Sequence, residues 1–226
     1  AQRGQATLYS LNTVTRALAA FQRTLLSFDS PYDRYRYGGQ PAAISAQAKR
    51  GEELFFGERL ECYHCHGGFN FTDNIQHARL PFPERGFHNT GLYNEDGQGA
   101  YPAAAPGISE FTGDARDRGK FRTPSLRNVA VTAPYMHDGS IATLPEVLRN
   151  HYARAGRAAT AGKGANPLRS ELIAGFQITD AEIADVVAFL QSLTDEAFLK
   201  NSAHADPWGQ AMAMSTRTPI EQPGSK

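Results

Sequence analysis

Near the start of the chain, apolar residues recur every three or four positions, which predicts a helix over residues 12–27 with one apolar face. The members of this face are Leu11, Val14, Leu18, Phe21 and Leu25. Pro31 and the pair Gly38-Gly39 end the segment. One helix cannot bury such a face against itself, so we expect another part of the protein to cover it.

Two further apolar stripes predict a pair of packed helices. The first helix begins after Ser45, a suitable N-cap, and runs to about residue 56, with Gly51 and Phe55 on one face. The second begins at a capping box formed by Thr179 and Glu182. Its apolar stripe comprises Ile183, Val186, Val187, Leu190 and Leu193. Because Gly51 has no side chain, we expect the two helices to cross closely, around Val187 and Leu190.

The rest of the chain predicts one more helix and many loops. Thr143 and Glu146 form a second capping box, and the helix that follows presents Leu144, Val147, Leu148 and either His151 or Tyr152 to the core. Residues 67–122 are rich in Gly and Pro, and no convincing strand is found there. We expect an extended tail beyond Pro207. The fold class predicted is all-α.

Composition and charge exclude several functions. The chain has 226 residues, with 23 Lys+Arg and 23 Asp+Glu, so no basic field attracts nucleic acid or an anionic membrane. No run of about 18 apolar residues is present, so no membrane span is expected. The two cysteines lie in one short motif, which excludes a disulfide framework and a Cys-rich zinc site.

That motif, Cys62-Tyr63-His64-Cys65-His66, is typical of covalent c-type haem attachment. One helical turn presents both thiols to the haem vinyl groups, and His66 then lies under the iron as its proximal ligand. A redox C-x-x-C pair is the weaker interpretation, because it does not need the histidine. We expect the haem between the two crossing helices. His64 is expected at the surface, as are His77, His88 and His204.

The ligand on the other face of the iron is left open by the residues alone. Met136 would supply a soft thioether that favours Fe(II), as in electron-transfer cytochromes, although it could instead fill a gap in a packed turn. Tyr152 would supply a hard phenolate that favours Fe(III) and higher oxidation states, although it could instead be a core aromatic. His137 and His151 are nearby candidates.

Several longer segments together resemble the bacterial di-haem cytochrome c peroxidase superfamily, and its MauG-like branch most closely. They are residues 21–25, 28–35, 49–52, 62–73 (CYHCHGGFNFTD), 88–94 (HNTGLYN) and 121–139 (FRTPSLRNVAVTAPYMHDG). The resemblance runs from about residue 12 to about residue 200. It implies a class I cytochrome c-like helical domain with long irregular loops.

Members of this family have two haem domains, and this chain resembles the C-terminal one with the linker helix before it. The resemblance implies a linker over residues 1–44, a haem domain over 45–203 and an extended tail over 204–226. The first C-x-x-C-H and the catalytic distal residues of the family are absent here. The peroxidatic haem, a second haem c, is therefore expected in a partner domain or subunit, and no catalytic residue is expected in this chain.

The resemblance also bears on the ligands. The MauG-like branch uses the Tyr of a His-Tyr pair, which matches His151-Tyr152 and favours Tyr152, with Met136 as runner-up. This sequence holds one extra residue between Leu144 and that pair. The family binds Ca²⁺ between its haems through backbone carbonyls of a Thr-x-Pro segment, which matches Thr132 and Pro134.

Two functions follow as hypotheses. The first is the electron-relay half of a di-haem peroxidase or MauG-like oxidoreductase, which uses oxidising equivalents from hydrogen peroxide. The second is a mono-haem cytochrome c that serves a periplasmic redox enzyme. Because c-type haem is assembled outside the cytoplasm, we expect a periplasmic protein with a redox partner or substrate protein there.

Overall fold

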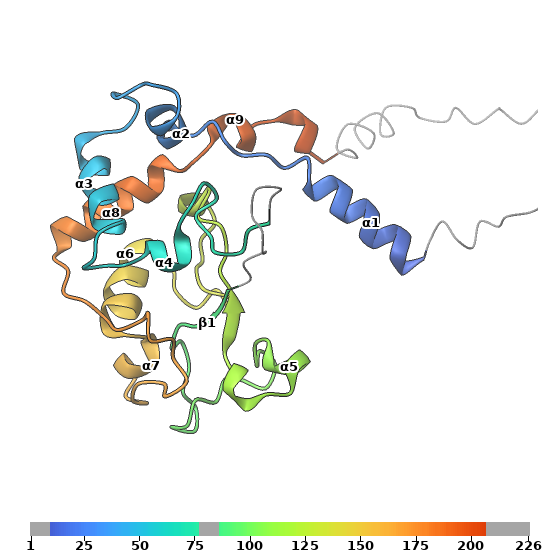
Figure 1. Ribbon diagram of the computed structural model, residues 1–226, viewed down its shortest axis with the longest axis vertical. Helices are drawn as coiled ribbons and strands as arrows, with labels where there is room; N and C mark the ends of the chain where they lie inside the picture. Colours follow the sequence, from blue (N-terminus) through green and yellow to red (C-terminus); the bar gives the residue numbers. More distant parts are fainter. Residues whose placement is uncertain (1–9, 77–85, 207–226) are drawn as a thin grey trace, which may run out of the picture. The chain divides into compact units, whose positions relative to one another are not determined.

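The computed structural model describes residues 10–76 and 86–206, and it divides into two units (Figure 1). One unit is a compact body over Phe28–Asp195. The other combines the segments before residue 28 and after residue 195. The predicted tail over 204–226 lies largely outside the described residues, which include only positions 204–206 of it.

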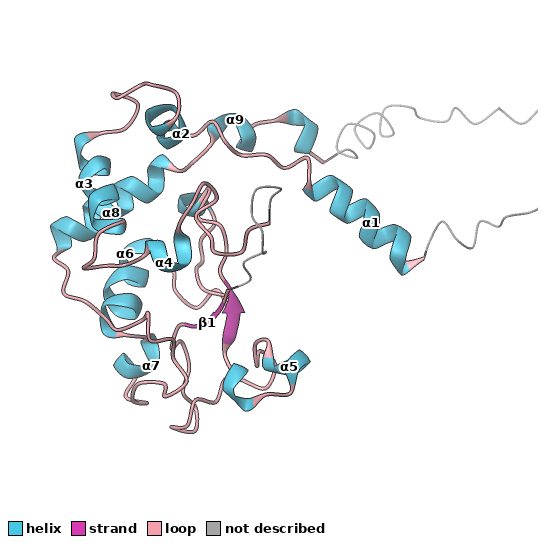
Figure 2. Cartoon of the chain, in the orientation of Figure 1, coloured by secondary structure: helices cyan, strands magenta, loops and turns pink. Residues whose placement is uncertain are grey.

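The compact body is mainly helical, with long irregular connections (Figure 2). Its helical elements in chain order are α2 (Pro31–Arg36), α3 (Ala46–Phe55), α4 (Tyr63–His66), α5 (Ser109–Thr112), η2 (Ala115–Asp117), η3 (Val129–Val131), α6 (Leu144–Glu146), η4 (Val147–His151), η5 (Tyr152–Arg154), α7 (Arg157–Thr160) and α8 (Asp180–Ser192). Ser45 caps α3, and both capping boxes named above are present, at the starts of α6 and α8. The predicted all-α class is confirmed.

Helices α3 and α8 cross in direct contact, as Gly51 predicted. A Cβ on Gly51 would lie 1.9 Å from the carbonyl oxygen of Asp185 and 2.9 Å from the Cβ of Phe189. Gly51 therefore faces Asp185 and Phe189, which lie within two residues of the predicted crossing around Val187 and Leu190. Backbones this close leave no room for a haem at the crossing, so the prediction that the haem lies between these helices was wrong there.

Aromatic side chains form the centre of the core around this crossing. The rings of Tyr32, Phe55 and Phe71 all contact Phe189, with centroid separations of 5.4, 5.1 and 6.1 Å. Phe71 and Phe189 are almost completely buried. Phe71 belongs to the loop that follows the C-x-x-C-H motif, so its burial in the core anchors that loop.

A second, smaller cluster of buried side chains lies beside the long loops. It consists of Leu92, Tyr101 and Ile141, with Tyr93, Phe121, Met136 and Val147 packed against it. Here the structure contradicts the expectation of no strand. Strands β1 (Phe87–Asn89) and β2 (Lys120–Arg122) pair antiparallel, with His88 opposite Phe121. Three-residue strands about thirty positions apart are too short to give a sequence alternation.

The second unit contains α1 (Leu11–Gln22), α9 (Glu196–Leu199) and η6 (Ser202–His204). Helix α1 ends five residues before the predicted end at residue 27. The five side chains of the predicted apolar face are exposed, although the last of them lies beyond the end of the helix: Leu11, Val14, Leu18, Phe21 and Leu25. No residue of α1 is buried, so the prediction that this face needs a covering surface stays a prediction.

Candidate functional site

The C-x-x-C-H motif lies on a single helical turn. Cys62 is the N-cap of α4, and Cys65 and His66 lie within it, so the backbone geometry that the motif needs is present. Burial raises the pKa of the Cys62 thiol to about 12 and that of Cys65 to about 11. Cys62 packs against the hydrophobic core, whereas the sulfur of Cys65 lies within 4.8 Å of the side-chain ligand atoms of Asp73 and His88.

The ring of His66 is held in one tautomer. Its Nδ1–H donates to the carbonyl oxygen of Phe71 at 3.0 Å, which leaves the lone pair of Nε2 free. Burial lowers the pKa of His66, although the carbonyls of Phe71 and Pro124 and the carboxylate of Asp73 act in the opposite direction. A neutral imidazole with one nitrogen fixed by a backbone carbonyl is the usual form of a metal-ligating histidine.

Tyr152 reaches the same interior from another part of the chain. The helix that starts at the Thr143–Glu146 capping box changes to a π-helical turn over Val147–His151 and then to a 3-10 turn that begins at Tyr152. A π-helical turn is the means by which a helix takes up one extra residue, and such turns are frequent at functional sites. The π-helical turn therefore accommodates the extra residue noted between Leu144 and the His-Tyr pair.

The phenol of Tyr152 has a raised pKa, to which the motif thiols contribute. Burial raises its pKa well above the usual range, and the charges of Cys65, Cys62 and Tyr101 raise it further, in that order. Tyr152 thus lies within electrostatic reach of both thiols. His151, the other member of the pair, is completely buried.

Taken together, these donors fit a c-type haem. Two thiols on one turn and an imidazole with a free Nε2 are the groups that covalent attachment and proximal ligation need. Of the other candidates, Met136 lies half-buried in a turn closed by the bridge between Tyr135 and Ile141.

The comparisons with known proteins agree with this donor set. A family model for cytochrome c matches residues 48–194. The methylamine utilization protein MauG of Methylorubrum extorquens is 38% identical over 185 residues, which cover 81% of this chain and 44% of that protein. The cytochrome c peroxidase Ccp of Escherichia coli is 32% identical over 185 residues, which cover 82% of this chain and 33% of that protein.

This chain belongs to the bacterial di-haem cytochrome c peroxidase and MauG-like family. A solved structure described as a MauG-like protein associated with microbial copper homeostasis is 49% identical, with a TM-score of 0.79. The match covers 88% of this chain and 57% of that one. The chain spans about half the length, or less, of the relatives named here.

Other residues predicted for this family member lie as follows. His64 is exposed and lies 3.7 Å from the carboxylate of Glu61, so its expected surface position is confirmed. His137 stacks on the ring of Phe121, with centroids 3.8 Å apart. Thr132 and Pro134, the carbonyls expected for Ca²⁺, are exposed just after η3. Every helix within the described residues is too short or too polar to cross a lipid bilayer.

The expectation that His88 is solvated was wrong. Its Nε2 lies 2.5 Å from a carboxylate oxygen of Asp73, and both side chains are mostly buried beside Cys65. Asp73 follows the motif by a few residues, and β1 brings His88 to it. A carboxylate soon after the motif was the available signal, but nothing in the sequence paired it with His88. His77 lies outside the described residues, and His204 is half-buried against Phe198.

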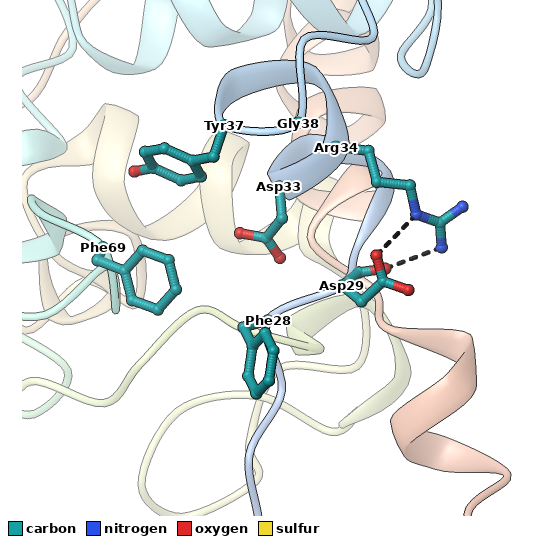
Figure 3. Close-up of a pocket in the computed structure, with 7 residues that line it drawn as sticks. All are labelled: Phe28, Asp29, Asp33, Arg34, Tyr37, Gly38 and Phe69. Atoms are coloured by element: carbon teal, nitrogen blue, oxygen red, sulfur yellow. Dashed lines mark hydrogen bonds and ion pairs between the residues drawn. The ribbon is translucent and has the colours of Figure 1, made fainter.

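A separate pocket lies away from these donors, around α2 (Figure 3). Its aromatic walls are Phe28, Tyr37 and Phe69, and an exposed ion pair between Arg34 and Asp29 lies at its rim. None of the haem-motif residues lines it. Its lining carboxylate Asp33 pairs with the buried Arg127, whose Nη2 also donates to the carbonyl of Phe69 at 2.8 Å.

Proposed function

We propose that this chain is the electron-relay haem half of a di-haem peroxidase or MauG-like oxidoreductase. In this proposal, His66 and Tyr152 hold the two axial positions of its haem. The peroxidatic haem, which reacts with hydrogen peroxide, belongs to a partner domain or subunit. The periplasm is the proposed compartment, because c-type haem is assembled outside the cytoplasm.

The observation that carries the proposal is the donor set of the motif, in which Cys62 and Cys65 lie on one helical turn with His66, whose Nε2 is left free. A second ligand to the iron would come from another element. Tyr152, at the start of η5, is the proposed ligand, and the motif thiols contribute to the raised pKa of its phenol. Met136 packs against Leu92, Tyr101 and Ile141 instead.

The haem would supply reversible one-electron chemistry, and the residues of this chain would set its midpoint potential. His66 keeps its proton on Nδ1, shared with the Phe71 carbonyl, so its Nε2 is available without a protonation step. The apolar surroundings of Tyr152 keep its phenol protonated until a cation comes close. An anionic phenolate then stabilises the more oxidised iron, which suits a relay of oxidising equivalents better than a high-potential carrier.

The exposed apolar face of α1 supports a partner for this chain. The five side chains of the predicted apolar face are exposed, which is unusual for a soluble surface. The missing haem domain is the proposed cover, since relatives of this chain are about twice its length. The carbonyls of Thr132 and Pro134 are the proposed contribution of this chain to a Ca²⁺ site shared with that domain.

The alternative function is a mono-haem cytochrome c with Met136 as the axial ligand, which passes electrons to a periplasmic enzyme. Met136 packs against the cluster that contains Tyr101, and Tyr101 contributes to the raised pKa of Tyr152. These two observations support the alternative. The deciding experiment is a haem count on the native assembly purified from its periplasm, together with its reaction with hydrogen peroxide. Two haems per particle and peroxide turnover are expected. One haem and no reaction would contradict the proposal.

A further inference from the structure

His151 has a hydrogen-bonding group that nothing in the described chain uses. The residue is completely buried at the end of the π-helical turn, next to Tyr152. Its Nδ1 accepts the backbone N–H of Arg157 at 3.0 Å. Its Nε2 is buried and has no hydrogen-bond partner among the described residues.

The bond to Arg157 decides where the proton of this ring lies. An Nδ1 that accepts a hydrogen bond carries no proton, so the neutral imidazole carries its proton on Nε2. The atom without a partner is therefore a donor. A buried donor without an acceptor costs free energy, and such groups in native proteins nearly always have a partner.

Two backbone carbonyls close to His151 in the sequence already accept hydrogen bonds. The carbonyl of His151 itself accepts the N–H of Gly156 at 2.9 Å. The carbonyl of Ala155 accepts from Nη1 of Arg169 at 3.3 Å. The ring of His151 meets that of Tyr152 edge to face, with centroids 4.7 Å apart. The unpaired donor thus lies next to the residue proposed as the second ligand of the iron.

We propose that Nε2–H of His151 donates to a propionate carboxylate of the bound haem and so fixes the propionate edge of the haem, the edge opposite the thioethers. A propionate is an anionic acceptor that arrives only with the cofactor, which accounts for a donor that the polypeptide leaves unpaired. His151 is a positioning residue in this role. The proposal needs a bound haem, but it does not need Tyr152 to be the axial ligand.

A matched pair of substitutions separates the two nitrogens of the ring. His151→Asn keeps an acceptor near the Nδ1 position for Arg157 but removes the donor at Nε2. His151→Gln keeps an amide N–H near the Nε2 position but withdraws the acceptor from Arg157. We measure the propionate bending mode by resonance Raman spectroscopy and the midpoint potential of the holoprotein, with thermal stability alongside.

The expected result is specific to the haem-facing nitrogen. His151→Asn should shift the propionate mode and lower the midpoint potential, because an unneutralised carboxylate favours the oxidised iron. His151→Gln should retain both values more closely while it loses more thermal stability. If His151→Asn keeps the wild-type mode and potential, then Nε2 serves a buried water or no partner, and the proposal is wrong.

A measurement on the unmodified protein covers the case in which neither variant folds. In the reduced holoprotein labelled with ¹⁵N-histidine, a slowly exchanging Nε2–H of His151 should show a nuclear Overhauser effect to the propionate methylene protons. Its absence would overturn the proposal. The band of the axial ligand is recorded in the same samples, so failure of the Tyr152 assignment is distinguished from failure of this one.

Discussion

Gly51 lies so close to the backbone of Asp185 that a Cβ in its place would be 1.9 Å from the carbonyl oxygen. This contact sets how closely α3 and α8 pack. Gly51→Ala gains about 1 kcal/mol of helix propensity, but its methyl group would clash with the backbone of Asp185, which cannot move as a flexible side chain could. We expect a net loss of about 2 kcal/mol or more in the free energy of unfolding, measured by denaturant titration of the holoprotein.

The exposed Glu53 on the same helix provides the control for this test. Glu53→Ala changes helix propensity without a steric contact, and its effect should stay within about 0.5 kcal/mol. A variant Gly51→Ala as stable as the wild type would mean that the two helices can move apart at little cost. The observed crossing would then not be what fixes the haem-motif loop.

The ion pair between Asp33 and Arg127 is buried on both sides, with 5% and 7% of the side chains exposed. Two hydrogen bonds of 2.8 and 3.0 Å join them. Asp33→Asn leaves the Arg127 charge buried without its partner, and we expect a loss of about 3–5 kcal/mol in the free energy of unfolding. Asp29→Asn removes the partner of Arg34 in an exposed pair, and this control should cost no more than about 1 kcal/mol.

The same pair predicts a dependence on pH. Burial alone would raise the pKa of Asp33, but hydrogen bonds from Arg127 and Ser30 outweigh it and lower the pKa below its ordinary value of 3.8. A carboxyl whose pKa is depressed by folding stabilises the protein above its unfolded pKa, and the contribution is lost as the pH falls through the folded pKa. The stability difference between wild type and Asp33→Asn should therefore be constant above about pH 5 and shrink below pH 4. A difference that does not change in acid would contradict this assignment.

The capping boxes at Thr143 and Thr179 offer another test, because they have the same hydrogen bonds but start helices that lead to different residues. In each, the Thr hydroxyl accepts the N–H three residues on, and a Glu carboxylate accepts the N–H of the Thr. Thr143→Ala and Thr179→Ala should each cost about 1 kcal/mol in thermal or denaturant unfolding. Only the helix after Thr143 leads to Tyr152, so only Thr143→Ala should also alter the visible spectrum of the haem. Equal spectra for both variants would contradict the assignment of Tyr152 as a ligand of the iron.

Local signals account for what the sequence predicted well. The caps at Ser45, Thr143 and Thr179 each involve residues three positions apart, and all three were confirmed. The same kind of box at Ser30 and Asp33, with Pro31 in the first turn, starts α2. The signal for α2 was therefore present in the sequence, although α2 was not predicted.

The parts that could not be predicted depend on distant partners or on the backbone. The acceptor that orients His66 is the carbonyl of Phe71, and a carbonyl leaves no mark in the sequence. His88 meets Asp73 only because β1 pairs with β2. The π-helical turn over Val147–His151, just before Tyr152, is a backbone conformation that side-chain periodicity cannot reveal.

The last prediction concerns Tyr152 and Met136. If the phenol of Tyr152 is the axial ligand, Tyr152→Met should introduce a sulfur-to-iron charge-transfer band in the oxidised holoprotein and raise its midpoint potential, since a thioether favours Fe(II). Met136→Leu should leave the spectrum unchanged, because it replaces one apolar side chain in the Leu92 and Tyr101 cluster with another. The opposite result, a wild-type band that Met136→Leu abolishes, would give the iron a thioether ligand. That result would turn the oxidising relay into an ordinary electron carrier, because the anionic charge that favours the oxidised iron would be gone.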